Sequence, residues 1–127
     1  FGDGLLLGIG RGDSWDSTKV ELYAEGESSV DPICSYERDH TSYSTEYKSY
    51  YINREEQLFG FACYDYSGES ATQNAYILLQ FNGNGFIEAA RVDLTRGDLA
   101  NMRAVLIDGY LYVFGDNDFE VVPVAIQ

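Results

Sequence analysis

Three short apolar segments of this chain begin 53 residues apart, at Leu5, Leu58 and Leu111 (58 − 5 and 111 − 58). Each follows a predicted turn and precedes a second strand-like segment. The turns are Asp3-Gly4, Glu56-Gln57 and Asp108-Gly109, and the second segments span residues 19–23, 75–81 and 119–124. Units of roughly 40 to 50 residues with about four strands each are typical of β-propeller blades. The interval therefore predicts an all-β chain built from copies of one antiparallel unit.

The expected strands fall into groups of three, four and three. The complete middle group has its strands at residues 48–52, 58–64, 75–81 and 86–92. The other expected strands include residues 32–36 in the first group and 103–107 in the third. The units then span about 1–37, 47–93 and 102–127 of a single propeller fragment.

The segments between these strands are expected to be turns and connections. Asn82-Gly83-Asn84-Gly85 predicts a hairpin, because Asn-Gly pairs accept the positive φ values that tight turns require. The polar segment 38–47 is expected to be a connection, and the segment 93–101 a loop with one helical turn.

Three units are too few to close a propeller ring, which needs about four to eight blades. We therefore expect about two and a half four-stranded blades of a larger propeller, with sheet faces that the rest of the parent protein or a second copy would cover. The chain starts at Phe1 without an initiator Met or a basic leader, so we expect a processed or trimmed piece whose signal peptide lies outside it.

The charge of the chain argues against two classes of partner. The 21 acidic and 8 basic residues give a formal net charge of -13, which would repel phosphate backbones and anionic membrane surfaces. The sequence has no apolar run near the roughly 20 residues that span a bilayer. We expect neither nucleic-acid binding nor membrane insertion.

An ordered set of segments resembles a known family. These segments are residues 3–10, 19–23, 47–51 and 103–112. They look like the last blades of bacterial secreted proteins whose C-terminal β-propeller domain is distantly related to WD40 repeats. Two departures are Tyr47-Lys48, where the family has His-Lys, and a shortened linker at residues 25–31. The resemblance implies an extracellular or cell-surface β-propeller without established catalytic residues.

Few residues offer nucleophilic or metal chemistry. His40 is the only histidine, and Cys34 and Cys63 are the only cysteines, which excludes zinc sites of several histidines or four cysteines within one chain. Packed thiols and a loop histidine are favoured over a Cys-His nucleophile, and a disulfide between the two cysteines stays open. Asp116 and Asp118 are weak candidates for calcium, because turn Asp residues also cap their own backbone. We expect no cofactor.

Tyrosines beside a carboxylate form a candidate ligand site. The candidates are Tyr47, Tyr50, Tyr64, Asp65 and Tyr66, with Tyr36, Tyr43 and Tyr51 nearby in the sequence. Aromatic rings next to carboxylates stack on and hydrogen-bond sugars or peptides, although half-buried strands also use tyrosine for packing. Structural roles are expected for Arg103, whose guanidinium would bridge blades, and for Asp108 and Gly109 in a turn.

These observations favour a non-catalytic extracellular module that binds proteins or glycans or serves as a scaffold. The alternative is part of a glycan-active hydrolase or lyase that uses carboxylates in the propeller channel. A third interpretation is a spacer that assembles a surface protein.

Overall fold

The structure is a computed structural model that describes residues 4–13, 16–24, 26, 32–66, 73–94, 99–116 and 119–124. Within these residues the chain is all-β, with eleven strands and two short 3₁₀ turns. The strands pair antiparallel in three separate sheets, none of which closes on itself. The predicted all-β class is confirmed. The turn pair member Asp3 and the linker 25–31, apart from Gly26, lie outside the described residues.

The first sheet contains three strands in the order β1-β2-β3. Its strands are β1 (Leu5–Arg11), β2 (Ser17–Ala24) and β3 (Cys34–Asp39). Alternate residues of β1 and β2 face the interior, as the period of two in a strand requires. The first sheet thus has one buried and one open face.

The middle sheet contains five strands. They are β4 (Thr41–Tyr43), β5 (Tyr51–Asn53), β6 (Leu58–Asp65), β7 (Gln73–Phe81) and β8 (Phe86–Leu94). β6 pairs with β7 on one edge, and β4 and β5 share its other edge at opposite ends. The hairpin at 82–85 is confirmed, with Gly83 at φ 96° and the Asn82 amide donating to the Gly85 carbonyl at 3.1 Å.

Two expectations next to the middle sheet are wrong. The expected strand 48–52 opens with a 3₁₀ turn, η1 (Tyr47–Ser49), and only its end belongs to β5. The buried Ser49 hydroxyl donates to the Glu46 carbonyl at 2.7 Å, and the Tyr76 hydroxyl donates to the Ser49 carbonyl at 2.6 Å. These bonds replace strand pairing there. The expected connection 38–47 contains the end of β3 and all of β4.

The third sheet has the order β11-β10-β9. Its strands are β9 (Arg103–Ile107), β10 (Tyr110–Phe114) and β11 (Phe119–Pro123). The 3₁₀ turn η2 (Leu99–Asn101) precedes β9, as expected for the segment 93–101. Asp108 and Gly109 have φ values of 51° and 82°, the two left-handed positions of a type I′ hairpin turn, so their turn role is confirmed.

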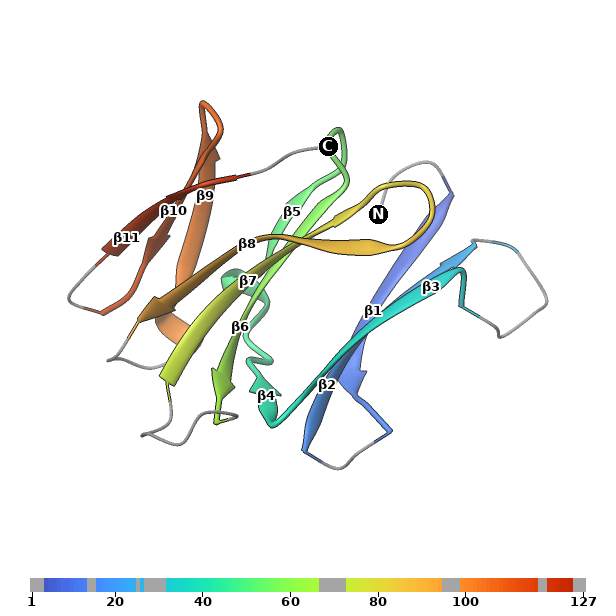
Figure 1. Cartoon of the computed structure of the whole chain (residues 1–127), viewed down its shortest axis with the longest axis horizontal. Helices are drawn as coiled ribbons and strands as arrows, with labels where there is room; N and C mark the ends of the chain where they lie inside the picture. The colour runs from blue at the N-terminus through green and yellow to red at the C-terminus, as the bar shows by residue number, and fades with distance from the viewer. Residues whose placement is uncertain are drawn as a thin grey trace.

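The three sheets stack with the middle sheet between the other two (Figure 1). One face of β6 and β7 packs against the first sheet through a core that includes Val20, Phe59, Phe61 and Ile77. The opposite face packs against the third sheet through a second core that includes Leu58, Tyr76, Leu111 and Val113. The middle sheet is therefore buried on both faces, whereas each outer sheet is buried on one.

The two intervals of the sequence repeat are unequal in the structure. Residues with left-handed backbone immediately precede β1, β6 and β10, at Gly4, Gln57 and Gly109. They are 53 and 52 residues apart (57 − 4 and 109 − 57). Because strand residues alternate between faces, a shift of one residue reverses the face. Leu58 accordingly faces the third sheet, whereas Leu111 faces back onto the middle sheet.

The equal second interval predicted from the sequence is thus wrong by one residue. The residues at the start of β6 are apolar on both faces because both faces are buried. The sequence of β6 therefore aligns equally well with that of β10 at an interval of 53 residues or of 52 residues. We call the alignment of the strands by these left-handed residues the structural frame. In the structural frame, Phe59 corresponds to Leu111, and Phe61 corresponds to Val113.

Candidate functional site

The expected tyrosine cluster is not one site. Tyr47 is 72% exposed on η1, whereas Tyr50 packs in the core between the first two sheets. Tyr64 and Asp65 are consecutive in β6 and therefore lie on opposite faces of the middle sheet. Tyr66 contacts His40 edge-on, with the ring centroids 6.2 Å apart. These residues are close in the sequence, but the sequence alone does not show which face of the sheet each side chain occupies.

Asp65 has a structural environment. Its side chain is only 4% exposed, and its Oδ2 atom lies 2.7 Å from Arg91 Nη2 and 3.4 Å from Arg38 Nε. Arg38 comes from β3 and Arg91 from β8, so the carboxylate joins the first and middle sheets. A buried carboxylate between two guanidinium groups is held in place and has no face open to a ligand.

A second acid extends this network. Glu88 accepts a hydrogen bond from the Tyr36 hydroxyl at 2.9 Å and lies 3.5 Å from Arg38 Nη1. Burial, and then the charge of Glu88, raises the pKa of Tyr36 to about 12. Arg38 is thus shared by the buried Asp65 and by Glu88, whose side chain is 34% exposed. Through Arg38, the two acids connect the first sheet to the middle sheet.

The two cysteines are free and belong to packed strands. Burial raises the pKa of the Cys63 thiol to about 12 and also raises that of Cys34. A nucleophile needs the thiolate, which these environments disfavour. His40 lies instead beside Asp16, with Nδ1 2.9 Å from Oδ2. The described residues therefore support the packed-thiol interpretation.

The remaining candidates also have local contacts. Asp116 is exposed and accepts a hydrogen bond from Asn101 Nδ2 at 2.8 Å, and Asp118 lies outside the described residues. No group of three or more metal-ligating side chains occurs in the part of the chain that the structure describes. Arg103 Nη1 donates to the carbonyls of Ala100 at 2.6 Å and Met102 at 2.8 Å. These carbonyls lie just before β9, so the observed bonds of Arg103 anchor η2 and do not bridge two sheets.

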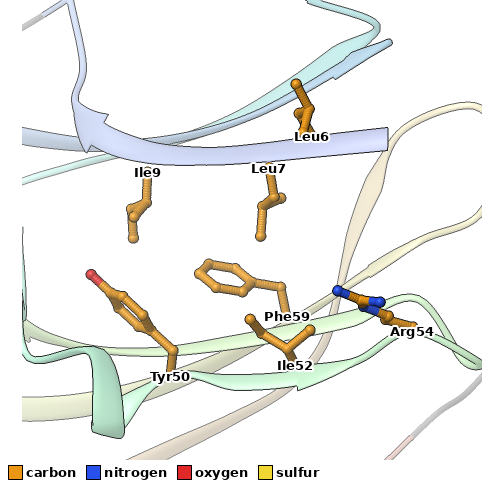
Figure 2. A pocket seen from close by; sticks show the side chains of 7 residues that line it. All are labelled: Leu6, Leu7, Ile9, Tyr50, Ile52, Arg54 and Phe59. Atoms are coloured by element: carbon orange, nitrogen blue, oxygen red, sulfur yellow. The ribbon is translucent and has the colours of Figure 1, made fainter. Parts of the chain in front are cut away.

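A cavity of about 310 Å³ lies between β1 and the strands β5 and β6. Leu7 and Ile9 point from β1 toward Phe59 and Tyr50, and Arg54 lies at one end (Figure 2). The cavity is lined by Leu6, Leu7, Ile9, Tyr50, Ile52, Arg54 and Phe59. Arg54 gives the cavity one cationic wall, and the other walls are mostly apolar. This lining suits a ligand in which an anionic group is attached to an apolar group.

A smaller cavity of about 210 Å³ is more polar. Its lining residues are Arg11, Asp16, Ser17, Thr41, Ser42, Tyr43 and Tyr66. Thr41 bridges the two sheets here, because its hydroxyl donates to Thr18 Oγ1 and its amide donates to the Asp16 carbonyl. Several of its polar atoms thus already bind within the protein.

The outer side of the third sheet, which we call the C-terminal end face, carries mostly apolar side chains. Strand pairing places Tyr110, Tyr112 and Phe114 of β10 between outward residues of β9 and β11. The face consists of Arg103, Val105, Ile107, Tyr110, Tyr112, Phe114, Phe119, Val121 and Pro123. Six of these apolar side chains are between 38% and 59% exposed. These side chains form a contiguous exposed apolar surface on the pairing positions of the three strands.

The outer side of the first sheet, the N-terminal end face, has different chemistry. Its outward residues alternate with the buried Val20 and Leu22. They are Leu6, Gly8, Gly10, Lys19, Glu21, Tyr23, Ser35, Glu37 and Asp39. Lys19 forms ion pairs with Asp13 and Glu21 on this side. The two ends of the stack therefore differ, one being apolar and the other mostly polar.

The sequence led us to expect uncovered sheet faces at the ends of the fragment but did not identify the residues of the C-terminal end face, although a signal was present. β9, β10 and β11 lack the alternation of polar and apolar residues that a strand with one solvated face shows. No helix in the described segments is long and apolar enough to cross a bilayer. Comparisons with known proteins found no matching family model, curated protein or solved structure.

Proposed function

We propose that the chain is a non-catalytic module of stacked, blade-like sheets, part of a β-propeller, that binds another β-sheet through its C-terminal end face. The supporting observation is the apolar character of the outer side of β9, β10 and β11, a side that no described sheet covers. The function is therefore protein binding and assembly.

The internal repeat indicates what covers this face. In the structural frame, the outer side of β10 corresponds to the side of β6 that carries Leu58 and Ala62. That side of β6 is covered by the following sheet, through Leu111 and Val113. By the same relation, the C-terminal end face would be covered by a further sheet that presents aliphatic residues.

The polarity of the two ends decides how two isolated copies would associate. A head-to-tail contact would press the C-terminal end face against Lys19, Glu21 and Glu37, and burial of these charges costs free energy. A contact between two C-terminal end faces buries apolar side chains on both sides. For the isolated chain we therefore propose a symmetric dimer, because a two-fold axis joins identical faces.

The charge of the protein adds a condition. The formal net charge of -13 opposes association of two copies at low ionic strength. Added salt screens this repulsion and strengthens apolar contacts. Association should therefore increase with salt, whereas a dimer held by ion pairs would weaken. The extracellular or cell-surface location is part of the proposal and rests on the family resemblance.

Light scattering across a range of protein and salt concentrations tests the proposal. The test variant is Val105→Lys with Val121→Lys, because both valines are 38% exposed and flank Tyr112 on the C-terminal end face. The control is Leu6→Lys, a residue 52% exposed at the other end of the stack.

We expect the unmodified chain and the Leu6 variant to associate as salt rises, and the double variant to stay monomeric. Circular dichroism of each variant establishes that the sheets are intact. A monomeric unmodified chain under all conditions, or association that persists in the folded double variant, would exclude the C-terminal end face as the assembly surface.

A further inference from the structure

The larger cavity reaches the edge of β1. Leu6 and Leu7 point to opposite faces of that strand, so a cavity lined by both must extend around its edge (Figure 2). The cavity also continues the packed interface between the first and middle sheets, because Leu7, Ile9, Tyr50 and Phe59 belong to the same core. It is therefore an extension of an existing sheet-to-sheet contact.

The other two sheets have a strand at the corresponding place. β5 pairs antiparallel with β6 just before the left-handed residue Gln57, and β9 pairs antiparallel with β10 just before Gly109. β1 also follows a left-handed residue, Gly4. Within the described segments, however, β1 is the edge of its sheet and pairs only with β2.

The middle sheet shows the consequence of this difference. Ile52 of β5 pairs with Phe59 of β6, so its side chain lies on the side that faces the first sheet. The Ile52 side chain is nevertheless 55% exposed. In contrast, Leu106 of β9 packs into the core against the middle sheet. Ile52 is thus an apolar side chain at a place where the first sheet presents no covering strand among the described residues.

We propose that the edge of β1 and the adjoining cavity bind one extended β-strand from a partner outside these 127 residues, antiparallel to β1, with apolar side chains opposite Leu7 and Ile9. The two apolar side chains of the partner strand would enter the cavity, because directly paired residues of antiparallel strands lie on the same face. Main-chain hydrogen bonds to β1 would supply general affinity, and the cavity would select alternate side chains.

The position of Arg54 adds charge selectivity. It lies at the end of the cavity near Leu6 and Leu7 (Figure 2). An antiparallel partner has its C-terminal end there, since β1 runs from Leu5 to Arg11. Arg54 forms no ion pair with the described residues. An acidic residue after the apolar pair would therefore be preferred in the partner strand.

The test uses the whole 127-residue chain and a blocked peptide of about six residues, the usual length of a strand. In the peptide, two valines alternate with threonines, and a glutamate two residues after the second valine lies on the same face as the valines. Amide chemical shifts in NMR titrations report where it binds. We expect shifts at β1, at Phe59 and at Ile52, without shifts at the C-terminal end face.

Matched isoleucines provide the variants. Ile52→Glu places a carboxylate in the cavity and should weaken peptide binding by roughly tenfold or more. Ile107→Glu is the control, because Ile107 is 48% exposed on the C-terminal end face. It should leave peptide affinity unchanged. Arg54→Glu should weaken the acidic peptide roughly tenfold and favour a peptide in which lysine replaces the glutamate.

Three results would overturn the proposal. They are no binding at millimolar peptide, shifts that map to the C-terminal end face, and affinity that is insensitive to Ile52→Glu in a folded variant. If the amide shifts of β1 instead change with the concentration of the chain itself, a second copy occupies this edge and the proposed outside partner is wrong. The site lies at the opposite end of the stack from the assembly face, so each proposal can fail while the other holds.

Discussion

Two phenylalanines at the same position of the sequence repeat should have very different effects on stability. Phe61 and Phe114 are 53 residues apart (114 − 61), and an exact repeat would bury both. In the structure Phe61 is fully buried in the core between the first and middle sheets, whereas Phe114 is 43% exposed on the C-terminal end face. Val113 occupies the place that corresponds to Phe61.

The expected magnitudes follow from burial. Phe61→Ala removes a buried ring and leaves a cavity, which lowers the free energy of unfolding by about 3 to 5 kcal/mol. Phe114→Ala removes a surface ring that is 43% exposed and leaves no enclosed cavity, and should cost below about 1 kcal/mol. Val113→Ala removes two buried methyl groups and should cost roughly 2 kcal/mol.

Urea unfolding followed by circular dichroism measures these differences. The protein concentration must be low enough to keep the chain monomeric, because dimerisation through the C-terminal end face would add stability that Phe114→Ala removes. The order of cost should be Phe61, then Val113, then Phe114. Equal costs for Phe61 and Phe114, with little cost for Val113, would refute the 52-residue structural frame and the assignment of the two faces.

Four further substitutions test the packing and the buried thiol. Gly60→Ala should cost about 1 to 3 kcal/mol in urea unfolding, because a Cβ atom there would lie 2.6 Å from Cε1 of the buried Tyr76 ring; an unchanged midpoint would refute the close approach. Asp65→Asn should cost about 1 to 3 kcal/mol, since it removes the charge between two arginines, whereas Asp93→Asn, with a side chain 47% exposed, should cost below about 1 kcal/mol. Burial raises the pKa of Cys63 from 9.0 to about 12, so the folded state keeps a proton that the unfolded state loses, and the stabilisation present below pH 9 falls as pH rises toward 12. Cys63→Ala should flatten this alkaline decline in unfolding titrations, and an unaltered slope would contradict the buried thiol.

Local patterns predicted most strands and turns of this chain. The segment 103–107 matches β9, and the turn expected at Asp108-Gly109 is present. These features depend on apolar runs and turn residues that lie next to each other in the sequence. The segment 47–49 was assigned incorrectly, because the contact that fixes its 3₁₀ turn comes from the distant Tyr76 hydroxyl.

The candidate site was harder to predict than the strands. A run of tyrosines does not reveal which face each ring occupies, and Tyr64 and Asp65 proved to lie on opposite sides of one strand. Asp65 pairs with Arg38, which belongs to β3 of the first sheet, and with Arg91, which belongs to β8 of the middle sheet. The cavity beside β1 likewise depends on how two sheets stack, and no local pattern in either sheet contains that information.

Native-state hydrogen exchange tests the central feature of the account, the stack in which the middle sheet is buried on both faces. Residues of β6 and β7 have neighbouring sheets on both sides, so their amides should exchange only through global unfolding. Amides of β1 and β11, at the edges of the outer sheets, should exchange faster. We predict the slowest exchange in β6 and β7. Exchange there that is as fast as in β1 and β11 would contradict the stack.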